Sequence, residues 1–209
     1  MPYASSAETQ EQILDVAESA IAQNGYAGMT LRNVVSQANV NLAAVHYHFG
    51  SKEDLLSAVL ARISGPIVTN QLAALEDLIA ASDAPPTVEA LLSAYLSPAL
   101  TCAMRCTASH PLRAQFIGRC RTEPEPVQSI ADAQFRPSTE KFLDALQRAL
   151  PDQTRSQLTW KLDLVVASLI RSLGQAGKPG ALLTGTLPED TEQAIAKLVA
   201  FLTPGLQSS

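Results

Sequence analysis

The sequence lacks the features that mark secreted, membrane and catalytic proteins. Its 209 residues include three cysteines, and the polar N-terminus does not read as a signal peptide. No apolar run reaches the roughly 18 residues of a membrane span. No G-x-S-x-G, P-loop, G-x-G-x-x-G or H-E-x-x-H motif occurs. These absences predict a cytoplasmic protein with reduced thiols, without a membrane partner, a cofactor or catalytic activity.

Aromatic residues and strand-like alternation are also scarce. Only 5% of the residues are aromatic, and no alternating Val, Thr and Tyr runs are bounded by hairpin turns. The chain is nevertheless 46% hydrophobic and 17% charged, a composition typical of globular proteins. Apolar residues recur at helical spacing, so we expect an all-α fold with a sizeable core.

Basic residues are few where a nucleic-acid partner would need them. The formal charge is -5, and the first 65 residues hold three basic residues (Arg32, Lys52 and Arg62) against six acidic ones. Lysine and arginine normally neutralise DNA phosphates, so this balance argues against DNA binding. If DNA is the partner, neutral donors, helix ends and a few cations must meet its phosphates, and the salt dependence should be shallow.

One stretch organises the chain, the segment 29–56 with the sequence MTLRNVVSQANVNLAAVHYHFGSKEDLL. Thr30 is a typical N-cap, and the following residues 31–38 place one apolar stripe on a two-turn helix. Asn39 tolerates the left-handed backbone of a sharp turn, and Asn41 can cap a second helix from Leu42 to about Phe49. The pattern predicts a helix-turn-helix.

The second helix of this motif has an unusual exposed face. It buries Val45 and Phe49 and leaves small and polar side chains outside, namely Ala43, Ala44, His46, Tyr47 and His48. Small residues let a helix sit deep in the major groove, while tyrosine and histidine tips can donate hydrogen bonds to phosphates. Gly50 ends the helix, Ser51 caps the next, and Lys52 stands at its N-terminus beside free N–H groups, where a phosphate can bind.

From Thr30 through Leu56 the sequence resembles the TetR family of transcriptional regulators. About a dozen positions agree in register. The resemblance implies a three-helix N-terminal domain, residues 1–50, linked by a long helix to a larger helical ligand-binding and dimerisation domain, residues 51–209. Carried over position by position, it implies phosphate contacts by Thr30, Tyr47, His48 and Lys52, and base-edge contacts by Arg32, Asn41, Leu42, Ala43, Ala44 and His46.

The chain departs from the family pattern at a few positions of the motif. Asn39 stands where many relatives have glycine, and Leu42, Ala44 and His46 stand where lysine, threonine or tyrosine is common. The assignments to base edges are affected more than those to phosphates. The variant VNLAAV-x-YHFGSK resembles a subgroup that includes fatty-acid-responsive regulators.

Further helices are expected on both sides of the motif. Residues 7–24 are expected to form a helix with one apolar face, which ends at Gly25. This helix should cover the apolar stripe on 31–38. The helix from Lys52 meets Ser64-Gly65-Pro66, where it bends or restarts, and continues to about Ala81. The later helices are expected at 87–97, 99–122, 127–150, 152–173 and 188–202, with interruptions at Pro111 and Pro137.

The helix at 152–173 carries two apolar stripes. One is Leu158, Leu162, Val165, Leu169 and Leu173, and the other is Trp160, Leu164, Ala167 and Ile170. Such a helix needs cover on two sides, which its own domain and a partner chain can provide. The family resemblance implies a homodimer through residues 154–173 and 188–203, paired across a two-fold axis.

The helices of the second half are expected to enclose a cavity for a small apolar effector. The candidate lining residues are Leu92, Tyr95, Phe116, Phe135 and Trp160. Arg119 either anchors a carboxylate of that effector or belongs to a solvated ion-pair surface. The sequence thus predicts a repressor that leaves a palindromic operator when the effector binds. The alternative is an apolar-ligand carrier without operator binding.

The cysteines and histidines do not define a metal site. His46 and His48 are two residues apart and point to different sides of a helix. Cys102, Cys106 and His110 share i, i+4, i+8 spacing, which suits either core packing or a thiol or metal sensor, but no fourth ligand is suitably spaced. We predict no metal site and leave open a redox role for Cys102, Cys106 or Cys120.

Overall fold

The computed structural model describes residues 5–105, 123–183 and 188–208. These residues form eight helices and no strand, so the all-α prediction is confirmed for the described parts of the chain. The helices are α1 (Ser6–Gly28), α2 (Leu31–Gln37), α3 (Leu42–Phe49), α4 (Lys52–Ala80), α5 (Val88–Arg105), α7 (Val127–Ala149), α8 (Arg155–Gly174) and α9 (Pro188–Gln207).

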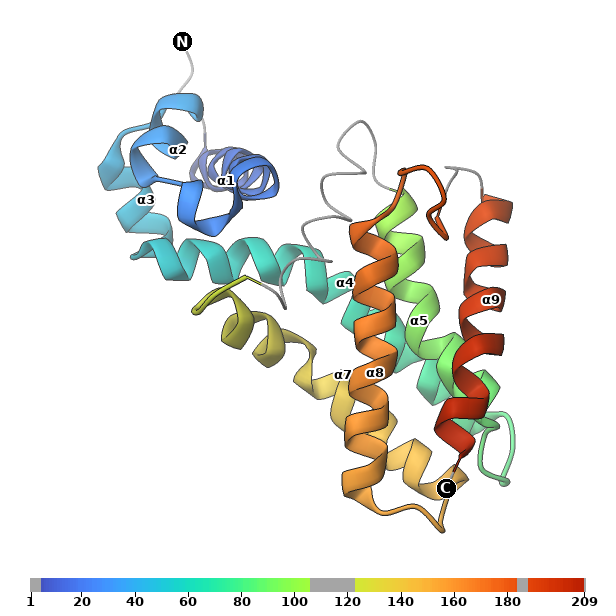
Figure 1. Ribbon diagram of the computed structural model, residues 1–209. Coiled ribbons are helices and arrows are strands. Elements are labelled where there is room, and N and C mark those ends of the chain that lie inside the picture. The colour runs from blue at the N-terminus through green and yellow to red at the C-terminus, as the bar shows by residue number, and fades with distance from the viewer. Residues whose placement is uncertain (1–4, 106–122, 184–187, 209) are drawn as a thin grey trace.

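The helices form two groups that share α4. Figure 1 shows α1, α2 and α3 gathered at one end of α4, and the remaining helices around its other end. In the second group α4 packs on α5 and α7, α5 contacts α9, and α8 contacts both α7 and α9. The predicted order of a small helical domain, a long connecting helix and a larger helical domain is confirmed.

The ends of the short helices are set by side-chain caps. Thr30 accepts a hydrogen bond from the Asn33 backbone N–H at 3.2 Å, and Asn41 accepts one from Ala44 at 2.8 Å. Ser51 and Asp54 form a reciprocal capping box at the start of α4. Asn39 has a φ of 50°, so the predicted left-handed turn between α2 and α3 is present.

Helix α1 covers the motif as expected. Its Ile13 and Ala17 are fully buried, as are Val34 of α2 and Val45 of α3. Burial of a side chain such as Val or Ile stabilises the fold by about 1.5–3 kcal/mol relative to exposure. This small core therefore fixes the angle between α2 and α3.

Several predicted helix ends were wrong, because proline and glycine did not stop the helices where expected. The predicted end before Pro98 is replaced by a helix that continues to Arg105, and α9 runs beyond Leu202 to Gln207. A proline inside a helix removes one backbone hydrogen bond, which buried neighbours such as Ala99 and Leu100 can offset. Gly25, with a φ of 71°, interrupts α1, but the helix resumes up to Gly28.

Five residues singled out from the sequence lie outside the described parts of the chain. They are Cys106, His110, Phe116, Arg119 and Cys120. Cys102, near the end of α5, is partly buried against the core. Within the described residues no group of three histidine, cysteine or acidic side chains is placed to hold a metal. None of the described helices is long and apolar enough to cross a bilayer.

Candidate functional site

Helix α3 presents a ridge of exposed side chains held by two buried anchors. Val45 and Phe49 point into the core, whereas Tyr47 is 82% exposed and Leu42 is 43% exposed. The ridge also contains Asn41, Ala43 and His46, which are exposed, and Ala44 and His48, which are half-buried. The predicted division of this helix into an inner and an outer face is confirmed. Apart from Leu42 and Tyr47, the outer side chains are small or polar, a form that can enter a major groove.

His46 is restrained by the end of its own helix. Its ring Nδ1 lies 2.7 Å from the backbone oxygen of Gly50, which has a φ of 80° and ends α3. With the proton on Nδ1, the ring donates to this carbonyl, and Nε2 is left as an acceptor. His46 can then accept a hydrogen bond from an amino group of a base without losing its place on α3.

Lys52 and Tyr26 form a second polar group beside α3. The Lys52 ammonium lies 4.2 Å from the centroid of the Tyr26 ring, a cation–π contact that joins α4 to α1. Burial, followed by the negative charge of Glu53, raises the pKa of Tyr26, so this phenol stays neutral at ordinary pH. The contact limits the positions that the Lys52 cation can take.

Arg62 is not available to DNA, because it holds α1 against α4. Its guanidinium contacts Glu11 at 3.2 Å, Asp15 at 2.6 Å and Glu18 at 2.9 Å. Burial lowers the pKa of Arg62, but the hydrogen bond to Asp15 and the charges of Glu18 and Asp15 outweigh burial and raise it. Only two of the three basic residues in the first 65, Arg32 and Lys52, therefore remain for phosphates.

The candidate effector residues do not all come together. Leu92 and Tyr95 are buried on α5, and the Tyr95 ring packs edge-on against Phe142 of α7, with the ring centroids 4.9 Å apart. Phe135 of α7 is partly buried against the same core. Trp160 lies elsewhere: it is 52% exposed on α8 and lines a groove toward α9. The apolar stripe that contains Trp160 faces outward, which the spacing alone could not decide.

Two buried polar residues on α4 were missed by sequence reasoning. Gln71 donates from Nε2 to the backbone oxygen of Tyr95 at 2.7 Å, but its Oε1 has no hydrogen-bond partner among the described residues. The Ser64 hydroxyl, also on α4, has none there either. Both residues are 2% exposed. Because their spacing of seven matches the apolar stripe of α4, a polar residue at a core position was the signal that could have revealed them.

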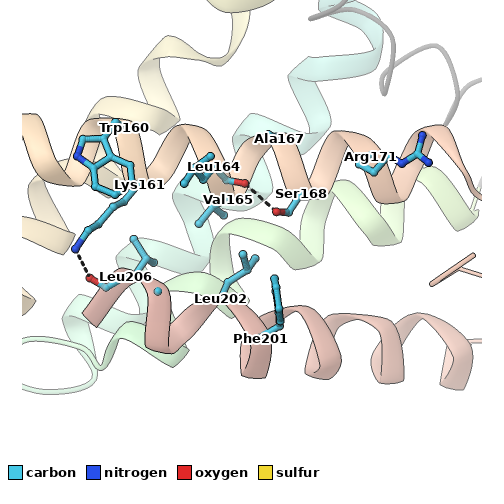
Figure 2. Close-up of a pocket in the computed structure, with 11 residues that line it drawn as sticks. Trp160, Lys161, Leu164, Val165, Ala167, Ser168, Arg171, Phe201, Leu202 and Leu206 are labelled. Carbon is cyan, nitrogen blue, oxygen red and sulfur yellow. Dashed lines mark hydrogen bonds between the residues drawn. The ribbon is translucent and has the colours of Figure 1, made fainter. Parts of the chain in front are cut away.

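An apolar groove runs between the outer faces of α8 and α9. Figure 2 shows Trp160 and Leu164 from α8 and Phe201 from α9 among its lining side chains. The groove has a volume of about 520 Å³, and its rim exposes Phe201 by 77% and Leu164 by 56%. The opposite stripe of α8, from Leu158 to Leu173, is buried in the chain's own core. Helix α8 thus has one covered and one uncovered apolar face.

Family models match both halves of the chain. Residues 13–59 match the model of bacterial regulatory proteins of the tetR family, and residues 93–205 match that of the tetracyclin repressor-like C-terminal domain. The chain belongs to the TetR family. The family resemblance read from residues 30–56 is thus confirmed, and both models describe regulatory proteins rather than enzymes.

Curated relatives share the helix-turn-helix region. The nicotine-responsive transcriptional repressor HdnoR of Paenarthrobacter nicotinovorans is 33% identical over 64 residues, which cover 31% of this chain and 33% of HdnoR. The transcriptional regulator TtgR of Pseudomonas putida is 38% identical over 53 residues, 25% of each chain. The chain thus matches between a quarter and a third of these relatives' length.

Solved structures share the fold over nearly the whole chain. A tetR family transcription regulator from Shewanella sp. PV-4 superposes with a TM-score of 0.69 at 16% identity and covers 94% of this chain and 97% of that one. The fatty acid degradation regulator FadR from Bacillus halodurans gives a TM-score of 0.67 at 13% identity, covering 93% and 98%. At these identities the likeness concerns the fold alone.

Proposed function

We propose that this TetR-family protein is an effector-responsive repressor that binds a palindromic operator as a homodimer. Residues 1–50 form its DNA-binding domain, and residues 51–209 bind the effector and the second copy. The exposed ridge of α3 is the observation that carries the proposal, because core packing does not account for an 82% exposed Tyr47 beside two buried anchors. We place the protein in the cytoplasm, where it would block transcription by occupying the operator.

The DNA contacts are divided between positioning and reading. We assign phosphate contacts to Thr30, Tyr47, His48 and Lys52, whose hydroxyl, imidazole and ammonium groups lie around the ridge. We assign base-edge contacts to Arg32 and to the ridge residues Asn41, Leu42, Ala43, Ala44 and His46. With two cations at this end, most phosphate contacts would be made by neutral donors.

The homodimer would form over residues 154–173 and 188–203. Support comes from the uncovered stripe of α8 and from the groove toward α9, whose exposed Trp160, Leu164 and Phe201 are the kind of aromatic and aliphatic residues that anchor interfaces. A two-fold pair would present two copies of α3 to half-sites about one helical turn, roughly 34 Å, or a small multiple apart.

A small apolar effector would bind between α4, α5 and α7. Leu92, Tyr95 and Phe135 supply apolar contact there, and Phe116 and Arg119 are proposed as further contacts. Gln71 Oε1, which has no partner among the residues that the structure describes, can accept one hydrogen bond from the effector, which would recover the roughly 1–3 kcal/mol that a buried unpaired polar group costs.

Helix α4 can transmit effector binding to α3. Arg62 ties the first half of α4 to α1, and Gln71 ties the second half to α5. Between these two contacts lie Ser64, Gly65 and Pro66, where the proline removes a backbone hydrogen bond and glycine lowers helix propensity. An effector that favours a different angle at this turn would move the two α3 ridges away from successive grooves.

The test is an electrophoretic mobility shift with the DNA upstream of the chain's own gene. We expect saturable binding to one palindrome, weakened at least about tenfold by Tyr47→Phe or Lys52→Ala, because each variant removes a phosphate contact in both half-sites. Lys141→Ala, at an exposed position of α7, is the matched control and should bind like the native chain.

The competing function is an apolar-ligand carrier, which the acidic character of the first 65 residues favours. Equal, weak binding of the native chain to every duplex, unchanged by Tyr47→Phe and Lys52→Ala, would reject the repressor and support the carrier.

A further inference from the structure

Lys161 of α8 is a charged residue in an interior position. It is only 5% exposed, and its ammonium reaches three acceptors: Gln153 Oε1 at 2.6 Å, the backbone oxygen of Leu206 at 3.3 Å and the backbone oxygen of Ser208. Its three donors are thus matched by three neutral acceptors. Among the described residues no carboxylate forms an ion pair with it. Burying an ammonium group is costly, and these three hydrogen bonds to fixed acceptors offset part of that cost and restrict where the Lys161 side chain can lie.

Two of the three acceptors, the backbone oxygens of Leu206 and Ser208, lie at the end of α9, and the third belongs to Gln153 between α7 and α8. Leu206 lies in the last turn of α9, where backbone carbonyls have no intrahelical donor and the helix dipole favours a cation. Gln153 donates to the same Leu206 oxygen at 2.7 Å, and its own backbone oxygen accepts from Gln147 of α7 at 2.7 Å. Lys161 and Gln153 therefore join α7, α8 and α9 at one point.

This point forms one end of the groove. Figure 2 shows the hydrogen bond from Lys161 to Leu206 beside Trp160, and both bonded residues line the groove. Most of the other residues that α8 and α9 contribute to the groove are apolar, for example Val165 and Leu202. Apolar contacts have no directional preference, so they do not fix how far one helix slides along the other. The directional hydrogen bonds of Lys161 fix this position of α8 along α9.

We propose that Lys161 is a positioning residue that sets the register of α8 against α9 and so shapes the surface on which a second copy of the chain docks. A slip of one residue would shift α9 by about 1.5 Å along its axis. Phe201 would then shift along the groove relative to Leu164, and two copies would no longer fit. This inference rests on the homodimer of the proposed function.

The experiment compares dimer dissociation constants, measured by sedimentation equilibrium at a temperature where every variant is folded. Lys161→Met keeps the length of the side chain and removes all donors, and we expect it to weaken the dimer at least about tenfold with unchanged helix content by circular dichroism. Lys161→Arg keeps donors and charge and should restore much of the affinity. Lys141→Met makes the same chemical change at an exposed site of α7 and should dimerise like the native chain.

Fluorescence gives a second reading, because Trp160 is the only tryptophan of the chain and lies in the groove. Its emission should shift to the red in Lys161→Met, as the ring loses the cover of the second copy. A role in stability alone would lower the unfolding midpoint and leave the dissociation constant and the emission unchanged. That result would overturn the proposal.

Two further variants separate the possible failures. If Lys161→Met does not fold, Gln153→Met removes the same link through a neutral residue and should weaken the dimer likewise; native dimerisation of this variant would overturn the proposal. Leu164→Glu changes the docking surface itself. A dimer that Leu164→Glu abolishes and Lys161→Met leaves intact would reject the positioning role only, whereas a monomeric native chain would reject the proposed dimer.

Discussion

The chain exposes two surfaces of opposite chemistry. The α3 ridge is small and polar, with Tyr47 at its centre, and the face of α8 and α9 is apolar, with Leu164 and Phe201 uncovered. Both are held by buried residues on the same helices, such as Val45 behind the ridge and Val165 behind the groove. Exposure alone therefore does not identify a binding partner, and the chemistry of the exposed side chains has to be considered as well. A polar ridge with few cations suits a DNA groove, whereas an uncovered apolar groove suits another protein surface.

The largest effect is expected from a charge in the apolar surface. Leu164→Glu places a carboxylate where the second copy would bury it, so the dimer should dissociate and operator affinity should fall at least about a hundredfold, as one half-site is lost. Sedimentation and operator titration measure the two effects together. A dimeric Leu164→Glu variant with native affinity would show that the groove is not the interface.

The polar surface is tested by salt. For the native chain the logarithm of operator affinity should fall gently with the logarithm of salt concentration, because few cations meet phosphates. Lys52→Ala should reduce that slope by about 2, because one phosphate contact is lost in each of the two half-sites. Titrations at several salt concentrations measure it, and a steep native slope would contradict the interpretation of a ridge rich in neutral donors.

Arg62→Met should weaken the packing of α1 on α4 without changing a residue of the α3 ridge or of the α8–α9 groove. It leaves Glu11, Asp15 and Glu18 close together without their cation. Because two of these carboxylates are largely exposed, we expect the free energy of unfolding to fall by about 1–3 kcal/mol, between the values for exposed and buried ion pairs. Urea unfolding measures the loss. Arg136→Met, an exposed site on α7, is the control and should change stability little.

The backbone is tested at two glycines, one near each surface. Gly205 lies inside α9 with open space where a Cβ would stand, so Gly205→Ala should raise the free energy of unfolding by about 0.5–1 kcal/mol. Gly50, with a φ of 80°, ends α3, and Gly50→Ala should instead destabilise the protein. Denaturant unfolding of both variants measures the contrast, and two changes of the same sign would contradict it.

The smallest effect concerns the first turn of α1. The Ser5 backbone N–H donates to Glu8 at 2.6 Å, and this bond lowers the pKa of the Glu8 carboxyl. A lowered folded pKa stabilises the protein above the ordinary carboxyl pKa, and this contribution is lost as the pH falls through the lowered value. Glu8→Gln should therefore melt slightly below the native chain at neutral pH and coincide with it in acid. Melting curves across the acid range measure the difference, which should not grow as the pH falls.

The fold was more predictable from the sequence than the apolar groove of α8 and α9. Caps such as Thr30 and Asn41 act through neighbours three residues away, so local patterns reveal them. The end of α5 was predicted too early, because the effect of Pro98 depends on how deeply its neighbours Ala99 and Leu100 are buried, and burial is not visible in the local sequence. Likewise, spacing identified two stripes on α8 but not which one faces outward, so Trp160 was placed in the wrong surroundings. The roles of Arg62, Gln71 and Lys161 depend on partners at least eight residues away in sequence, which no periodicity records.

The carboxylates around Arg62 also bear on how the proposed repressor would find its operator. Three of them surround that one cation, so the back of the small domain has a negative potential, and the chain as a whole carries -5. Such a protein is repelled by duplex DNA in most orientations and gains little from sliding along it. Its search would proceed by repeated three-dimensional collisions that succeed only when the α3 ridge faces the DNA. Few molecules would be bound non-specifically to other chromosomal sequences.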